Sequence, residues 1–311
     1  MSKQVEIQQR ITNQIIVALE SGNLPPWRKP WFCKSNVGSP CNIVSRRNYR
    51  GINPLLLWLH QDRFSFESKY YATFDQWKKL GGKVMPRPAD VKSGEWGSTI
   101  VYYNIVTKSY EDPSTGIEME RNFPILRTFT VFNIDQVEGS HLDRYRADKE
   151  IVVEHDFVDY TPAENFINGL DADIQHGGSQ AFYRPSTDEI RVPHKESFHT
   201  PADYYSTVFH ELGHWTEKRC NWNGSYAEGE LRAEIAGCFL MNELGVPVSN
   251  SDESMKNHYA YLENWLSALK SDPKFIFRAS TAASKTVDYL LKESVFQTSQ
   301  ESEEELVEAT A

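Results

Sequence analysis

The segment His210–His214, with the sequence His-Glu-Leu-Gly-His, constrains the fold of this chain more than any other feature. Positions four apart lie on one face of an α-helix, so His210 and His214 can present both imidazoles to one metal ion. Glu211 can then reach a water molecule on that ion and act as a general base. Residues 203–209 contain no Pro or Gly, which favours a helix that runs through the motif. The pattern therefore predicts a metal site of the zinc-hydrolase type.

A site of this kind needs a third protein ligand. Segment 228–237 has a helical composition and carries Glu230 and Glu234 on one helical face. Glu234 follows His214 at the interval that glutamate zincins use, so we expect coordination by His210, His214 and Glu234. Glu230 is then expected to support the site through a hydrogen bond or an ion pair. Zinc is the expected metal, and a His-His-Glu site with an open position also accepts manganese or cobalt.

Metal sites of this type hold an extended substrate against the edge of a β-sheet. Gln180–Tyr183 and Ile190–Pro193 are both candidates for the edge strand. The hydroxyl of Tyr183 could polarise a substrate carbonyl, although its position favours a packing role. The motif by itself also permits two ordinary helix histidines that bind no metal, and the helical context and the suitably spaced glutamates argue against that alternative.

The first half of the chain has the opposite net charge to the second. Residues 1–139 hold 18 Lys and Arg against 13 Asp and Glu, a net charge of +5, whereas residues 140–311 have a net charge of −15. No acidic residue occurs between Ser21 and Gln61. Positive charge follows a phosphate backbone and aromatic faces stack unpaired bases, so this window predicts binding of single-stranded DNA rather than a solvated basic rim around a core. The candidate contact residues are Trp27, Arg28, Lys29, Trp31, Lys34, Arg46, Arg47, Tyr49 and Arg50.

Local patterns predict an α+β fold in two domains. Apolar spacing favours a helix near residues 5–22, and a turn rich in Pro and Gly joins the expected strands Ser98–Val106 and Ile125–Phe132 into a hairpin. Short strands at Ala181–Tyr183 and Glu189–Val192 precede a mostly helical region. We expect an N-terminal α+β DNA-binding domain at 1–139, a polar linker at 140–160, a mostly helical metallopeptidase domain with a small sheet at 161–297, and an acidic disordered tail at 298–311.

The composition favours an aqueous and reducing compartment. Residues 1–10 lack the apolar core of a signal peptide, and no apolar run approaches the roughly 20 residues of a spanning helix. The 4 cysteines are too scattered to form a disulfide framework, so reduced thiols are expected. We therefore expect a cytoplasmic protein with no membrane partner.

Taken together, these motifs resemble the ArdC-type antirestriction proteins of conjugative plasmids and the N-terminal regions of plasmid TraC primase-like proteins. The resemblance covers roughly residues 5–295, and it implies an N-terminal single-stranded-DNA-binding domain joined to a C-terminal zincin-like metallopeptidase domain. It also implies protection of incoming plasmid or phage DNA from host restriction. Residues 90–97 depart from the family pattern, with Trp96 where a basic residue is expected. The matching segments are Pro26–Trp31, Asn48–Asn53, Thr73–Trp77 with Gly81 and Gly82, Thr130–Gln136, Tyr183–Ile190, His210–His214, Glu230–Leu240 and a late segment from Tyr261 to Ala283.

Two other functions stay open from the sequence. The chain could be a stand-alone metalloprotease whose basic half docks substrate, or a non-enzymatic inhibitor that mimics DNA through its negative charge. The positive charge of residues 1–139 weakens the second alternative. On the favoured hypothesis the partners are single-stranded DNA and a host restriction protein or another protein substrate. Whether the metal site hydrolyses peptides is left open.

Overall fold

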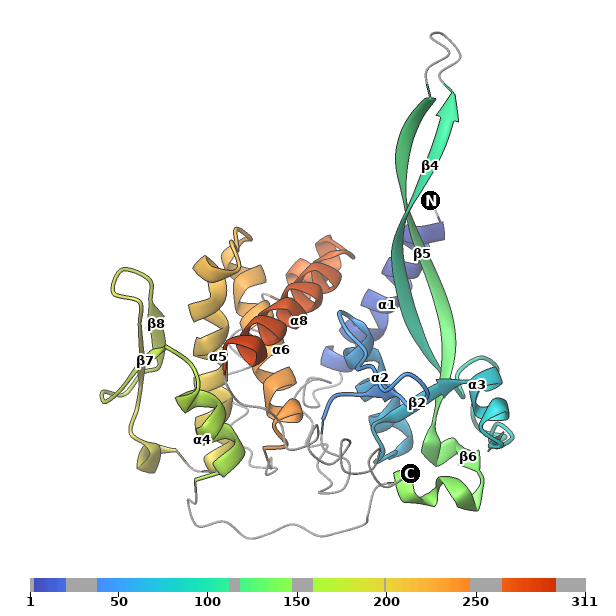
Figure 1. Cartoon of the computed structure of the whole chain (residues 1–311), viewed down its shortest axis with the longest axis horizontal. Helices are drawn as coiled ribbons and strands as arrows, with labels where there is room; N and C mark the ends of the chain where they lie inside the picture. Colours follow the sequence, from blue (N-terminus) through green and yellow to red (C-terminus); the bar gives the residue numbers. More distant parts are fainter. Residues whose placement is uncertain are drawn as a thin grey trace, which may run out of the picture.

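The computed structural model describes residues 3–20, 38–111, 118–146, 159–198, 200–246 and 265–294. Figure 1 shows an N-terminal lobe with a sheet and a projecting hairpin, beside a mostly helical C-terminal lobe with a small sheet. This is the α+β architecture that the sequence predicts. Some sequence predictions lie outside the described residues, namely those on Trp27, Arg28, Lys29, Trp31, Lys34 and the tail 298–311.

The N-terminal lobe is built on a four-stranded sheet with the strand order β1-β2-β5-β4. Its strands are β1 (Cys41–Asn42), β2 (Tyr70–Thr73), β4 (Ser98–Glu111) and β5 (Glu118–Asn133), and a separate pair is formed by β3 (Lys83–Val84) and β6 (Val137–Glu138). β4 and β5 pair antiparallel along their whole length and form the hairpin that projects from the lobe in Figure 1. Both strands run beyond the apolar segments that predicted them, because backbone pairing continues where the side chains are exposed.

Three helices accompany this sheet: α1 (Lys3–Glu20), α2 (Asn53–Phe64) and α3 (Phe74–Lys79). β2 leads directly into α3, because the Thr73 side chain caps the helix by accepting a hydrogen bond from the Gln76 backbone N–H. The indole of Trp77 is fully buried and donates to the Phe132 carbonyl. Residues 140–145 of the expected linker form a 3-10 helix, and its Leu142 packs in the apolar cluster that also contains Trp77.

The C-terminal lobe begins with α4 (Thr161–Asn168) and a three-stranded sheet of order β7-β9-β8. The strands are β7 (Asp173–His176), β8 (Phe182–Arg184) and β9 (Glu189–Val192), and the helices that follow are α5 (Pro201–Arg219), α6 (Tyr226–Glu243) and α8 (Phe275–Glu293). β9 is the central strand, so Ile190–Pro193 is not available as a substrate-binding edge. β8 is an edge strand of this sheet and lies against α5.

The two lobes share one hydrophobic core. Apolar residues of α1 and α2 belong to the same buried cluster as those of α5, α6 and α8. Trp58 of α2 meets Phe239 of α6 edge to face, with ring centroids 5.5 Å apart. The Thr12 hydroxyl of α1 donates to the Pro273 carbonyl at 2.7 Å. The relative position of the lobes is therefore set by packing between them.

A search of the described residues for a bilayer-spanning helix found none with the necessary length and apolar character.

Candidate metal centre and nucleic-acid interface

The metal-binding motif lies where α5 and α6 pack unusually close together. A Cβ atom at Gly213 would lie 2.9 Å from Ala233 Cα and 3.0 Å from its Cβ. One turn away from this contact, a Cβ atom at Gly237 would lie 3.3 Å from the His210 backbone nitrogen. The absence of side chains at both glycines lets the two helix backbones approach each other. Acidic side chains of α6 consequently come within reach of the histidines of α5.

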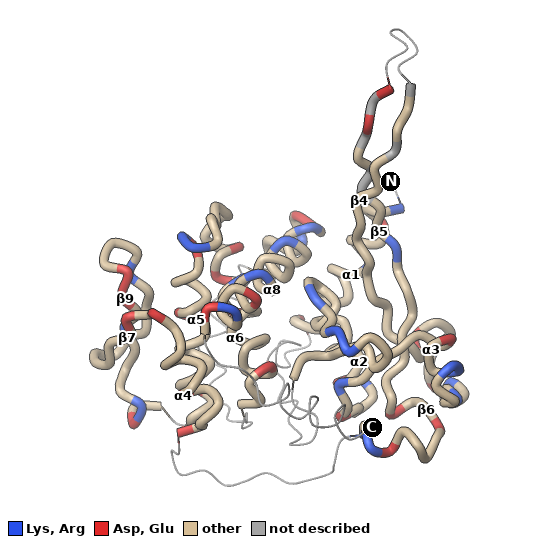
Figure 2. The backbone as a smooth tube through the Cα atoms, in the orientation of Figure 1, with Lys and Arg blue, Asp and Glu red and all other residues tan. Residues whose placement is uncertain are grey.

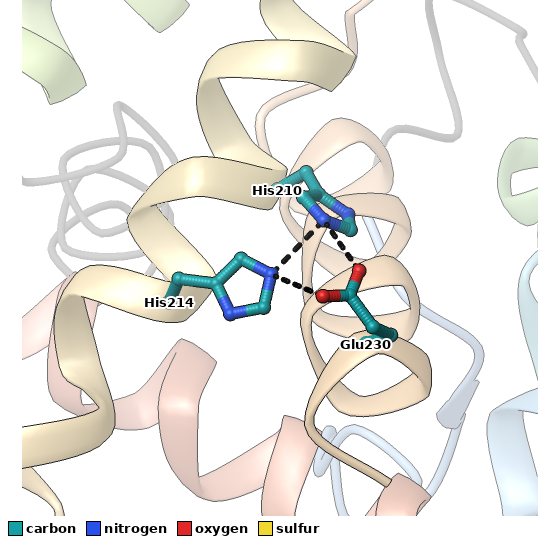
Figure 3. Close-up of side chains that lie close together, drawn as sticks. All are labelled: His210, His214 and Glu230. Atoms are coloured by element: carbon teal, nitrogen blue, oxygen red, sulfur yellow. Dashed lines mark hydrogen bonds and ion pairs between the residues drawn. The ribbon is translucent and has the colours of Figure 1, made fainter. Parts of the chain in front are cut away.

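His210, His214 and Glu230 point toward one another from these two helices, as Figure 3 shows. The two histidine Nε2 atoms are 3.1 Å apart. The Glu230 carboxylate oxygens lie 3.5 Å from His210 Nε2 and 3.6 Å from His214 Nε2. Ligand atoms bound tetrahedrally at about 2.0–2.2 Å from one ion are separated by about 3.3–3.6 Å. The side chains therefore fit a divalent cation in both chemistry and spacing.

The geometry favours Glu230 over the expected Glu234 as the third ligand. Glu234 approaches the other ring nitrogen of His210, with Oε2 3.7 Å from Nδ1. Both acids lie on one face of α6, but only Glu230 places its oxygens beside both Nε2 atoms. Glu230 thus faces both Nε2 atoms and Glu234 lies on the Nδ1 side of His210, an arrangement that favours Glu230 as the ligand and Glu234 as the supporting residue.

A second carboxylate that the sequence analysis missed supports His214. Glu217 Oε1 lies 2.8 Å from His214 Nδ1, and a carboxylate can only accept, so Nδ1 carries the proton and Nε2 is left with its lone pair. The buried Arg232 holds Glu217 in turn, with Nη2 3.2 Å from Oε1, and also donates to the Gly213 carbonyl at 2.8 Å. Glu217 follows His214 by three positions, and that helical spacing is the signal that could have identified it.

The close approach of carboxylates and imidazoles shifts the pKa values of groups in the site. Burial disfavours the charged imidazole of His210, but the carboxylates of Glu230 and Glu234 outweigh that effect and raise its pKa to about 9. Burial also disfavours the Glu230 carboxylate, yet hydrogen bonds to both histidines hold its pKa far below the usual range. The metal-free cluster therefore already pairs positive charge with a buried carboxylate.

Glu211, the expected general base, is almost completely buried beside the two histidines. Burial raises the pKa of its carboxyl, although His210, His214 and a backbone hydrogen bond from Tyr183 oppose the rise. That hydrogen bond attaches the edge strand β8 to the motif helix. The Tyr183 hydroxyl itself donates to Asp188 at 2.8 Å and is therefore engaged within the β8–β9 hairpin.

The predicted DNA contacts that are described lie around the loop before α2. Arg47 and Tyr49 line a cavity of about 1290 Å³ between the lobes, and so does Arg50. Arg50 is ion-paired with Asp288 of α8. Arg46 is directed elsewhere, with its guanidinium over the Tyr145 ring, 4.7 Å from the centroid. Three of the predicted contact residues therefore lie on one wall of this cavity.

Comparisons with solved structures and with protein-family models show which family this chain belongs to. Residues 5–132 match the N-terminal domain of the anti-restriction factor ArdC, and residues 161–282 match a zincin-like metallopeptidase domain. The metal-free crystal structure of the antirestriction protein ArdC from plasmid R388 is 36% identical, covers 94% of this chain and 99% of that chain, and superposes with a TM-score of 0.72. The chain belongs to the ArdC antirestriction family. The Mn(II)-bound form of the R388 ArdC protein is also similar, with a TM-score of 0.69 at 33% identity over 93% of this chain and 99% of that chain.

Other similar proteins include one of comparable length and two much longer primases. An uncharacterised protein of Sinorhizobium fredii, y4eC, is 32% identical over 92% of this chain and 91% of its own length. Two Escherichia coli DNA primases named TraC are 33% and 31% identical over 91% and 90% of this chain. This ArdC-family chain spans 27% and 19% of those primases. The sequence resemblance to ArdC proteins and to TraC is therefore confirmed.

Proposed function

We propose that this ArdC-family protein binds single-stranded DNA, protects incoming DNA from host restriction, and uses a divalent-metal site for peptide hydrolysis. The observation that carries the metal part is the convergence of His210, His214 and Glu230 at ligand spacing. Restriction takes place where the DNA is, so the proposal implies action in the cytoplasm of the host cell. The membership of the ArdC family supports the antirestriction role.

Three side chains would hold the metal ion in this proposal: His210 and His214 through Nε2, and Glu230 through its carboxylate. Glu217 would orient His214 and Glu234 would orient His210, each from the Nδ1 side. The Mn(II)-bound structure of the R388 protein supports a divalent ion in sites of this family. Zinc stays the ion that we expect from the donor set, with manganese and cobalt as alternatives.

When bound, a divalent cation at these side chains would supply Lewis acidity to water and to a peptide carbonyl. Glu211 would accept a proton from the attacking water at its carboxylate and deliver it to the leaving amine nitrogen. Its raised pKa suits both steps, because such a carboxyl group exchanges protons closer to neutral pH. The edge strand β8 would hold an extended peptide by main-chain hydrogen bonds beside the motif helix.

Substitution of the general base tests the enzymatic part directly. Glu211→Gln should retain the metal, measured by elemental analysis of the purified protein, and should abolish hydrolysis of a peptide library. Glu196→Gln, at an exposed position on a short 3-10 helix, is a matched control that should retain both properties. A Glu211→Gln protein that loses its metal would show that the ligand and base roles are wrongly assigned.

Protection from restriction needs a separate measurement. Cells that carry the wild-type protein or the Glu211→Gln variant are compared for the efficiency of phage infection or plasmid transfer in a restricting host. Equal protection would dismiss proteolysis as the mechanism and leave DNA binding as the function. If the wild-type protein hydrolyses peptides but gives no protection, the alternative of a stand-alone metalloprotease is favoured.

A further inference from the structure

The cavity between the lobes has walls from both halves of the chain. One wall consists of the loop before α2 and the base of the β4–β5 hairpin, and the other consists of α8 and the turn between α5 and α6. Its volume of about 1290 Å³ exceeds the roughly 300–1,000 Å³ that is usual for small-ligand sites. No Asp or Glu lines it among the described residues, although the second half of the chain is strongly acidic. The size and the charge both favour an extended anionic ligand.

Exposed cations face the cavity from both lobes. Arg47 comes from the loop before α2, and Lys274 and Lys285 come from the start and the middle of α8. All three side chains are exposed, and none forms an ion pair with another residue in the described ranges. Figure 2 marks the Lys and Arg positions along α8 and in the loop before α2. By contrast, Arg278 in the same wall is held by Glu228 and Asp272.

Aromatic side chains also face the cavity from both walls. On the hairpin, Tyr102 and Phe129 are 50% and 45% exposed and meet edge to face with centroids 6.3 Å apart. Trp222, in the turn between α5 and α6, and Phe277 of α8 are partly exposed on the opposite wall. Aromatic rings that are exposed on one wall and partly exposed on the facing wall are typical of surfaces that stack unpaired bases.

We infer that a single DNA strand passes through this cavity and that the metallopeptidase lobe supplies part of the binding surface. In this arrangement Lys274 and Lys285 contact the phosphate backbone from the C-terminal lobe, while Arg47 contacts it from the N-terminal lobe. A duplex is disfavoured because its bases are already paired and stacked, which leaves Tyr102 and Phe129 without a partner. The inference rests on the proposed function and extends the DNA interface beyond the N-terminal domain.

Two pairs of single variants of the full chain test this location. Lys285→Gln is compared with Lys292→Gln, since both lysines are exposed on α8 but only Lys285 lines the cavity. Tyr102→Leu is compared with Tyr110→Leu, since both tyrosines are exposed on β4 but only Tyr102 lines the cavity. Binding of a fluorescent oligothymidine of ~20 nucleotides is measured by anisotropy over a range of salt concentrations. Thermal unfolding and metal content confirm that each variant is folded.

We expect Lys285→Gln and Tyr102→Leu each to weaken binding at least about threefold, with both controls within about twofold of wild type. Loss of one phosphate contact should also reduce the slope of log affinity against log salt by about 0.7 for Lys285→Gln alone. If the wild type binds the oligonucleotide and the cavity variants bind it equally well, the location is overturned while the proposed function stands. A wild type that ignores single strands at low salt would overturn both, and equal binding of a matched duplex would overturn the single-strand assignment.

Discussion

Glu217 Oε1 lies 2.8 Å from His214 Nδ1, on the side of the imidazole that faces away from Glu230. This contact fixes the tautomer of His214 and directs the lone pair of Nε2 toward the centre of the candidate metal site. Arg232 in turn holds the carboxylate of Glu217 from the interior of the lobe. The orientation of one candidate metal ligand thus depends on a chain of partly buried hydrogen bonds that begins outside the motif.

Loss of the Glu217 charge should weaken metal binding without removing a ligand. Glu217→Gln can still accept a hydrogen bond from His214, but it no longer increases the basicity of the imidazole. We expect a decrease in metal affinity of about 10-fold, at the lower end of the 10–100-fold range for such partners. Competition with a chromogenic chelator measures it, with Glu196→Gln as the control. An unchanged affinity would mean that Glu217 serves only to bind Arg232.

The assignment of the third ligand predicts opposite outcomes for two neighbouring glutamates. Glu230→Gln removes the carboxylate beside both Nε2 atoms and should lower metal affinity by at least about 100-fold. Glu234→Gln leaves that ligand set intact and should cost about 10-fold or less. The same chelator competition compares them directly. The reverse order of effects would return Glu234 to the ligand role that its sequence interval suggested.

Close packing of α5 on α6 makes Gly213 sensitive to the addition of one methyl group. In Gly213→Ala the new Cβ would meet Ala233 at 2.9–3.0 Å, so the helices must separate. We expect a loss of about 1–3 kcal/mol in the free energy of unfolding, together with weaker metal binding. Gly229→Ala is the control, because its Cβ would meet only side-chain atoms at 3.4–3.5 Å. Urea denaturation of the metal-free proteins should therefore separate the two variants, and equal stability would refute the packing argument.

Stability and metal affinity should change in opposite directions with pH. The folded-state pKa of His210 is raised from 6.5 to about 9. Its contribution to the stability of the metal-free protein is therefore fully present below about pH 6.5 and is lost as the pH rises through about 9. Metal binding requires the neutral imidazole, so metal affinity should rise over the same window.

Thermal unfolding across this pH range, with a chelator or with saturating metal, measures both trends. We expect the melting temperature of the chelated protein to fall toward alkaline pH, while the stabilisation by metal grows. A His210→Gln protein should show both trends more weakly, and the remainder reflects His214, whose pKa is also raised by Glu217 and Glu230. A metal-induced stabilisation that is independent of pH in the wild type would contradict the assignment of His210 as a ligand.

Much of the site can be predicted from sequence because its signals are local. Helical spacing alone places His210, Glu211 and His214 on one helix, and capping by Thr200 with Pro201 in the first turn starts that helix where the motif requires it. The apolar period of α1 and the Pro- and Gly-containing turn that predicted the hairpin are local in the same sense.

Sequence alone cannot tell which of Glu230 and Glu234 faces the Nε2 atoms, because both lie on the same face of α6. Only the position of α6 along α5, set by the contacts of Gly213 and Gly237, brings one of them beside the Nε2 atoms. Exposure of Tyr102 and Phe129 is also a tertiary property, since the pattern of a strand does not tell a core aromatic from a solvent-facing one.

The helix that carries the candidate metal motif, the α+β class, the family and the basic character of the first half can all be predicted from the amino-acid sequence, because each depends on neighbouring residues or on composition. Only the folded chain shows which glutamate faces the two histidines, which carboxylates contact their Nδ1 atoms, and that both lobes line one cavity. These properties depend on how helices far apart in the chain pack together. That packing depends on contacts between side chains of different helices, and the spacing of residues within one helix does not show those contacts.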